Sequence, residues 1–346
     1  MLLWFAWLWF NPGPAPYRYQ QTEQGGVDQF PQLGLSAWPD LEITRYEIHT
    51  EGVEQPLAVT HAARRGNDAP VRLDWENRTS ELLLTTDLKL SELTELAAAI
   101  DKYAPGDALI LGWWDTSRQL GLLTTRQTLF TQRVGEPLIV PAPWSNRVDA
   151  VAHYEDTFWG AAASADERSR FERFADALVA PPEQGAAILR ELSGDREAYV
   201  AIHVTDLYKL GLLRPEQFDM AYKNFPMEGN MHGLIGYLKN WMLENGYKTY
   251  TLQSLTDKLV RGYFLRDEQS SQTLLAQMLP FTTSQPLDLA ALQLIYQQGG
   301  YWVYRIPPAP GAATPPLEPP IPPAPSQATP DTADSGNQEE ASPEAP

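Results

Sequence analysis

The fold is decided by the stretch Ala108-Leu-Ile-Leu-Gly-Trp113, an apolar run that directly follows the turn residues Pro105-Gly-Asp107. A short apolar run bounded by turn residues is typical of a strand that is buried on both faces of a parallel sheet. A sheet of this kind needs a layer of helices on each face to exclude water. The run therefore predicts an α/β fold with a buried strand near residue 110.

Strand and helix patterns alternate along the chain before and after this run. Residues 41–48 and 71–75 alternate between apolar and polar side chains, as half-buried strands do. Helical stretches separate the later strands, and this order is typical of βαβ units. The later predicted strands are 138–140, 199–204, 247–252 and 301–306, and the predicted helices are approximately 91–103, 166–178, 183–192, 215–224, 234–242 and 271–278.

These patterns together predict one α/β domain over residues 41–306. Its expected core is an open, largely parallel sheet with helices on both faces. Residues 11–40 are rich in Pro, Gly and Gln, which favours an extended lead-in to this domain. We find no internal repeat and no composition shift inside residues 41–306 that would divide the domain.

The two ends of the chain differ from the domain between them. Residues 1–10, MLLWFAWLWF, are wholly apolar but fall short of the roughly 20 residues that span a bilayer. They fit the end of a longer signal-anchor, a short interfacial anchor, or a buried first strand or helix. We expect a hydrophobic N-terminal anchor that contacts a membrane. Residues 307–346 carry thirteen prolines, six acidic residues and no basic ones, which predicts a disordered tail.

The composition excludes several classes of function. The formal net charge of −18 argues against nucleic acid as a partner, because phosphate binding needs a basic surface. The absence of cysteine excludes thiolate metal sites, iron–sulfur clusters and Cys-x-x-Cys-His haem attachment. No short-spaced histidine pair and no Gly-x-Ser-x-Gly elbow occurs. We therefore predict no catalytic residues, no cofactor and no metal site.

The most distinctive string, Trp113-Trp114-Asp115-Thr-Ser-Arg118, lies at the carboxyl end of the buried run. Open α/β sheets place their ligand crevices at the carboxyl ends of strands. Two indoles, a carboxylate and a guanidinium would form a candidate binding site from Trp113, Trp114, Asp115 and Arg118. In the alternative interpretation, Asp115 caps the next helix and pairs with Arg118, while the indoles fill the core.

Several segments of the chain carry a family resemblance. They are PYRYQ at 16–20, DALILGWWDTSRQLGLLTTRQTLF at 107–130, HVTDLYKLGLLRPEQFDMAYKNF at 203–225, MHGLIGYLKNWM at 231–242, LLAQMLPF at 274–281 and QLIYQQGGYWVYRI at 293–306. In overall pattern these segments resemble HaoB, the hydroxylamine-oxidation accessory protein of ammonia- and methane-oxidising bacteria. The resemblance covers most of the domain and does not extend to the proline-rich tail.

A second, partial resemblance rests on Trp113, Trp114 and Asp115. These residues are similar to the Trp-Trp-Asp segment of oligosaccharyltransferase catalytic subunits, which recognises the hydroxyl group of the acceptor peptide. Thr116-Ser117 replaces the Tyr-Gly of that family, and the membrane bundle that carries its catalytic acids is absent from this sequence. This resemblance implies at most a relict domain that binds a peptide or a small polar ligand.

The resemblance to HaoB implies the more specific function. It implies a non-catalytic periplasmic accessory protein that binds, anchors or helps to mature the multihaem hydroxylamine oxidoreductase. A chain without cysteine cannot attach c-type haem itself, so electron transfer would belong to that partner. The apolar residues 1–10 and the spacer after them would hold the domain on the periplasmic side of the inner membrane.

Overall fold

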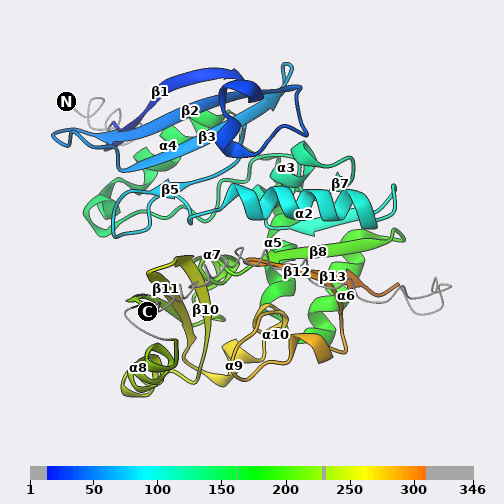
Figure 1. Cartoon of the computed structure of the whole chain (residues 1–346). Helices are drawn as coiled ribbons and strands as arrows, with labels where there is room; N and C mark the ends of the chain where they lie inside the picture. Colours follow the sequence, from blue (N-terminus) through cyan, green and yellow to red (C-terminus); the bar gives the residue numbers. More distant parts are fainter. Residues whose placement is uncertain (1–13, 161, 228–230, 309–346) are drawn as a thin grey trace, which may run out of the picture.

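The computed structural model describes residues 14–160, 162–227 and 231–308 and shows three sheets surrounded by helices (Figure 1). Two sheets have five strands each and one has three. The predicted α/β class is therefore confirmed in its mixture of sheets and helices. Among the described residues, no helix is both long and apolar enough to cross a membrane. Residues 1–10 and 309–346, with the predicted anchor and most of the tail, lie outside the described ranges.

The central sheet contains the apolar run that predicted the fold. This run forms β6, which pairs in parallel with β7 on one side and with β8 on the other. The last strand, β13, then pairs antiparallel with both β8 and β12. In spatial order the sheet consists of β12 (Gln293–Gln298), β13 (Tyr301–Ile306), β8 (Ala198–His203), β6 (Leu109–Gly112) and β7 (Gln127–Thr128).

Helices cover both faces of this central sheet, as predicted (Figure 1). Leu109 and Leu111 of β6 pack into one hydrophobic cluster, while Ile110 between them packs into another. This alternation follows from the two-residue period of a strand. The first cluster includes residues of α5 (Ala165–Val179), α6 (Pro182–Ser193) and α10 (Leu274–Met278), and the second includes residues of α2 (Leu90–Tyr103) and α3 (Trp114–Leu123).

A second sheet, antiparallel throughout, packs on the far side of α2 and α3. Its residues Ile43 and Ala63 share a hydrophobic cluster with Leu93 and Leu120 of these helices. The helix α4 (Val148–Trp159) covers part of the same sheet and packs Val151 against Ile48. The strands are β1 (Tyr17–Gly26), β2 (Leu41–Thr50), β3 (Ala58–Arg65), β4 (Val71–Arg72) and β5 (Glu76–Asn77).

The third sheet lies on the opposite side of the central sheet (Figure 1). Its antiparallel strands enclose a small hydrophobic cluster with α8 (Met231–Glu244), in which Phe225 and Phe264 contact Leu238. The remaining helices are short and connect this sheet to the central one. The elements are β9 (Met220–Pro226), β10 (Thr249–Thr256) and β11 (Leu259–Leu265), with α7 (Asp206–Leu213) before them and α9 (Glu268–Ser271) after them.

The prediction of an open, largely parallel sheet is wrong. Among the described strands, only the pairs β6–β7 and β6–β8 are parallel, and the other pairs are antiparallel. The reason lies in the length of the connections. A parallel pair needs a crossover of a dozen or more residues, whereas residues 51–57 between β2 and β3 and residues 257–258 between β10 and β11 permit only hairpins.

Three local predictions also need correction. Residues 215–224 were predicted as a helix, but β9 begins at Met220 and pairs with β11 over its full length, so sheet pairing overrides the local helix signal. The predicted strand at 138–140 is reduced to one bridge between Ile139 and Leu84. The predicted lead-in at 11–40 contains β1, which pairs with β2 and buries Tyr17 and Tyr19.

Candidate functional site

The candidate residues lie where β6 passes directly into α3. Trp113 precedes the helix as its N-cap residue, and Asp115 lies in the first helical turn. The Asp115 Oδ1 atom accepts a hydrogen bond from the backbone N–H of Thr116 at 2.7 Å. A carboxylate at this place is favourable because the first turn of a helix exposes unpaired N–H groups and the positive end of the helix dipole. The alternative interpretation that Asp115 caps this helix is wrong, because Trp113 is the N-cap residue and Asp115 already lies inside the first turn.

The main partner of Asp115 is Lys209 on α7. The Lys209 Nζ atom lies 3.1 Å from Asp115 Oδ1 and 3.0 Å from Asp115 Oδ2. It also lies 3.1 Å from Asp206 Oδ1, and Asp206 Oδ2 accepts a hydrogen bond from the backbone of His203. All three charged side chains are buried. Because α3 follows β6 and α7 follows β8, the two parallel strands bring this Asp115–Lys209–Asp206 triad together at their carboxyl ends.

The contacts of the triad favour the charged forms of Asp115 and Lys209. Burial alone opposes ionisation of Asp115, but the Lys209 ammonium and its hydrogen bonds outweigh burial and lower the pKa of that carboxyl. Burial likewise opposes the charge of Lys209, but Asp115 and Asp206 outweigh it and raise the pKa of that amine. A lysine that stays protonated cannot act as a nucleophile or a general base at neutral pH. The triad therefore fixes two elements together rather than supplying a reactive amine.

The two tryptophans of the string have different environments. Trp113 is fully buried, with its ring edge-on to Phe171 at a centroid distance of 5.2 Å, and Lys209 Nζ lies 5.5 Å from its ring. Trp114 is 7% exposed and donates a hydrogen bond from Nε1 to the backbone oxygen of Glu136 at 2.5 Å. Trp113 thus belongs to the core beneath the triad, whereas Trp114 forms part of a cavity wall.

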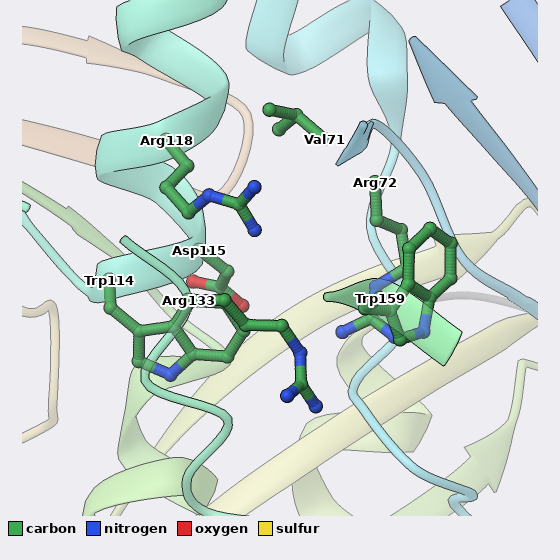
Figure 2. Close-up of a pocket in the computed structure, with 7 residues that line it drawn as sticks. All are labelled: Val71, Arg72, Trp114, Asp115, Arg118, Arg133 and Trp159. Atoms are coloured by element: carbon green, nitrogen blue, oxygen red, sulfur yellow. The ribbon is translucent and has the colours of Figure 1, made fainter. Parts of the chain in front are cut away.

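That cavity lies between α3 and the antiparallel sheet. Figure 2 shows the side chains of Arg72, Arg118 and Arg133 around it, with Asp115 among them and the indoles of Trp114 and Trp159 at its sides. Its volume is about 20 Å³. Since roughly 10–15 Å³ is needed to hold one water molecule, the cavity has room for a molecule of a few atoms.

The three arginines of this cavity differ in their partners. Arg133 is buried and forms ion pairs with Asp156 and, at 3.8 Å, with Glu155. The alternative interpretation predicted that Arg118 pairs with Asp115, and this prediction is wrong. Arg118 instead donates a hydrogen bond from Nη2 to the backbone oxygen of Pro70 at 3.1 Å. Among the described residues, no carboxylate forms an ion pair with Arg118 or Arg72.

Arg72 is positioned by aromatic rings instead of a carboxylate. Its guanidinium carbon lies 5.2 Å from the ring centroid of Trp75 and 5.8 Å from that of Trp159. Such cation–π contacts hold a guanidinium in place without consuming its N–H donors. Arg118 shows the electrostatic result of this crowding, because burial, Arg133 and Arg72 together lower its pKa to about 10.

Glu155 supports the arginine cavity from the side of α4. It is buried, and its Oε1 atom accepts hydrogen bonds from the hydroxyl groups of Tyr17 at 2.6 Å and Tyr19 at 2.7 Å. Burial, followed by the charge of Glu155, raises the pKa values of both tyrosines, so their hydroxyl groups remain donors. These contacts link the first strand to α4 and to Arg133.

The candidate site is thus larger than the four residues named from the sequence. Asp206 and Lys209 were missed, although they follow a predicted strand just as Asp115 does, and that shared position was a usable signal. Arg72, Arg133 and Glu155 gave no such signal, because only the fold brings them to the cavity. Among the described residues, no group of three or more His, Asp and Glu side chains could hold a metal ion.

Comparison with known proteins gives a family match and a limited structural likeness. The family model described as "HaoA-associated protein HaoB" matches residues 1–306. No individual curated protein matches the chain. A solved structure, the C-terminal domain of PglB from C. jejuni, aligns at a TM-score of 0.36 and 10% identity, covering 62% of this chain and 99% of that one.

Proposed function

The chain belongs to the family of HaoA-associated protein HaoB, and from this we propose that it is a non-catalytic accessory protein that binds HaoA, the hydroxylamine oxidoreductase. Membership of this family indicates an accessory role in hydroxylamine oxidation. The observation that carries the proposal is the extent of the match, which runs from residue 1 to the last residue of β13. The site geometry adds support, because the triad locks its lysine in the protonated form.

Several features of the chain bear on how HaoA would be bound. Trp113 and Asp115 are buried, so a large partner cannot contact them without opening the fold. The contact would therefore use other parts of the surface. The net charge of −18 favours a basic patch on the partner, and attraction of that kind weakens as salt rises.

Direct titration tests this proposal. The whole chain, in mild detergent, is titrated against HaoA from the same organism by calorimetry at low and moderate salt. The whole chain is needed because β1 already begins at Tyr17. We expect saturable binding that weakens with salt. The absence of binding at tens of micromolar, with the protein folded, would exclude a stable complex with the mature enzyme.

A shortened chain provides the matched comparison. Since the family match ends at residue 306, deletion of residues 309–346 is expected to leave HaoA binding unchanged. This variant keeps the contact between Arg190 and the backbone oxygen of Pro307. Binding that disappears with the deletion would move the partner site from the family domain to the proline-rich tail.

We further propose that the domain lies on the periplasmic side of the inner membrane and is anchored through residues 1–10. The apolar sequence of this segment supports the proposal. The cysteine-free chain allows a clean test, because Leu287→Cys places a single thiol at a side chain that is 81% exposed. A membrane-impermeant maleimide should label this thiol once the outer membrane has been permeabilised, while the inner membrane is still intact. Labelling only after the inner membrane is broken would contradict the proposed location.

A further inference from the structure

The cavity between α3 and the antiparallel sheet has the features of an anion site, a role that goes beyond the proposed binding of HaoA. The protein is strongly acidic, yet three arginines converge here on one small space (Figure 2). Like charges gather in this way only where something of opposite charge compensates them. The question is whether the carboxylates of the cavity already do so.

The charges around the cavity and the triad balance in number, but the ion pairs among them leave out two arginines. Lys209 pairs with Asp115 and Asp206, and Arg133 pairs with Glu155 and Asp156. Arg72 and Arg118 have no carboxylate partner among the described residues. Arg72 is half-buried on two indoles, and Arg118 is half-buried with one hydrogen bond to a backbone oxygen. Their remaining N–H groups are available to a further acceptor.

We propose that this cavity binds a small oxoanion, held between the guanidinium groups of Arg72 and Arg118. The guanidinium group presents N–H donors in a planar fork that matches carboxylate and other oxoanion oxygens. The volume of about 20 Å³ restricts the ligand to a few atoms. The indoles of Trp114 and Trp159 line the cavity, and these apolar rings lower the local polarity and so strengthen the attraction of an ion to the two arginines.

The lowered pKa of Arg118 agrees with this geometry. Burial, Arg133 and Arg72 lower this pKa, and the opposing attraction of Asp115 does not outweigh them. A bound anion would add a second opposite charge and raise the pKa of Arg118. The ligand chemistry is shared by small carboxylates and inorganic oxoanions, so the experiment must distinguish these two sources.

Formate serves as the probe for small carboxylates, and nitrate serves as the probe for inorganic oxoanions. The melting temperature of the whole chain is measured while either salt replaces sodium chloride at constant ionic strength. We expect a saturable increase of about 2 °C or more, since a ligand that binds only the folded state stabilises it. A larger effect of formate identifies a carboxylate site and a larger effect of nitrate an inorganic one.

Variants of the two unpaired arginines locate the site. Calorimetry with the more effective probe should show affinities lowered about tenfold or more in Arg118→Gln and in Arg72→Gln, since each loses a charged donor. Arg173→Gln is the matched control, because Arg173 lies on α5 and pairs with Glu191 outside the cavity. It should bind the probe as the unchanged protein does.

Two results would overturn the inference. One is the absence of any saturable effect of formate and nitrate beyond that of chloride. The other is equal affinity of the unchanged protein, Arg118→Gln and Arg72→Gln. If a glutamine variant fails to fold, Arg118→Lys replaces it, because lysine keeps the charge but lacks the fork, and the affinity should still fall. None of these results bears on HaoA binding, so the two proposals fail independently.

Discussion

The Asp115–Lys209–Asp206 triad and the arginine cavity are neighbours at the carboxyl end of β6, but they handle buried charge in opposite ways. In the triad, one ammonium group lies about 3 Å from each of two carboxylates, so every charged group has an ion-pair partner within the protein. In the cavity, Arg72 and Arg118 lie near Asp115 but form no ion pair with a carboxylate of the described residues. Buried charge is therefore consistent with a purely structural role in the triad, whereas the unpaired N–H donors of the cavity are what support the proposed anion site.

The largest expected effect comes from breaking the triad at its centre. Lys209→Met leaves Asp115 and Asp206 buried with no positive partner, so the free energy of unfolding should fall by about 3–5 kcal/mol. Denaturant titration measures this loss. Lys89→Met is the control, because Lys89 is exposed and its pair with Glu92 is long at 3.7 Å. A loss below about 1 kcal/mol for Lys209→Met would show that the triad does not hold α3 and α7 together.

Arg133 tests the paired side of the cavity. Arg133→Met leaves Glu155 buried, but Tyr17 and Tyr19 continue to donate to it. The free energy of unfolding should therefore fall by about 2 kcal/mol, which is less than for Lys209. Denaturant titration again gives the value, with Arg173→Met as the exposed control. A loss as large as that of Lys209→Met would mean that the hydrogen bonds from Tyr17 and Tyr19 are not enough to stabilise buried Glu155 once Arg133 is removed.

Asp115→Asn tests the contribution of the Asp115–Lys209 ion pair through the pH dependence of the free energy of unfolding. The variant should lose about 1–2 kcal/mol at neutral pH, since Lys209 keeps Asp206 as its partner. The lowered pKa of Asp115 means that its stabilisation is complete above the unfolded pKa near 4 and is lost as pH falls through the lower folded value. Unfolding measured from pH 7 to pH 2 should thus show the two proteins converging in acid. A constant difference over this range would contradict the ion pair.

The smallest expected effect is at Arg118. Arg118→Met removes a charge without a carboxylate partner, and the lost bond to Pro70 is offset by relief of repulsion from Arg72 and Arg133. The free energy of unfolding, measured without added oxoanion, should change by no more than about 0.5 kcal/mol. A loss above about 2 kcal/mol would place Arg118 among the structural residues and remove the contrast with the triad.

The parts of the fold that could be predicted are those with a local signal. The helix α2 was predicted closely, because Leu93, Leu96, Ala97 and Ile100 recur at helical spacing and all are buried. Its predicted start at residue 91 differs by one residue from the observed start at Leu90. The strand β9 was predicted as a helix because its partner β11 lies far along the chain. A short stretch of sequence does not indicate with which distant strand it will pair.

The candidate site divides in the same way. Asp115 and Arg118 were found because they follow a buried strand, where sheets of this class place their crevices. The pairing of Asp115 with Lys209 depends on β6 lying next to β8, which the sequence did not reveal. The cluster of Arg72, Arg118 and Arg133 depends on three separate segments meeting. In an acidic chain, no single arginine signals such a cluster.

The position of β13 has a consequence for the order in which the protein is completed. This strand is the last element of the described chain, yet it lies inside the central sheet between β8 and β12. The growing polypeptide therefore lacks an interior strand of its main sheet until residue 306 has been synthesised. Until then β8 presents an open edge that other chains could join. A premature stop shortly before Tyr301 would leave a protein with most of its residues and an unfinished centre.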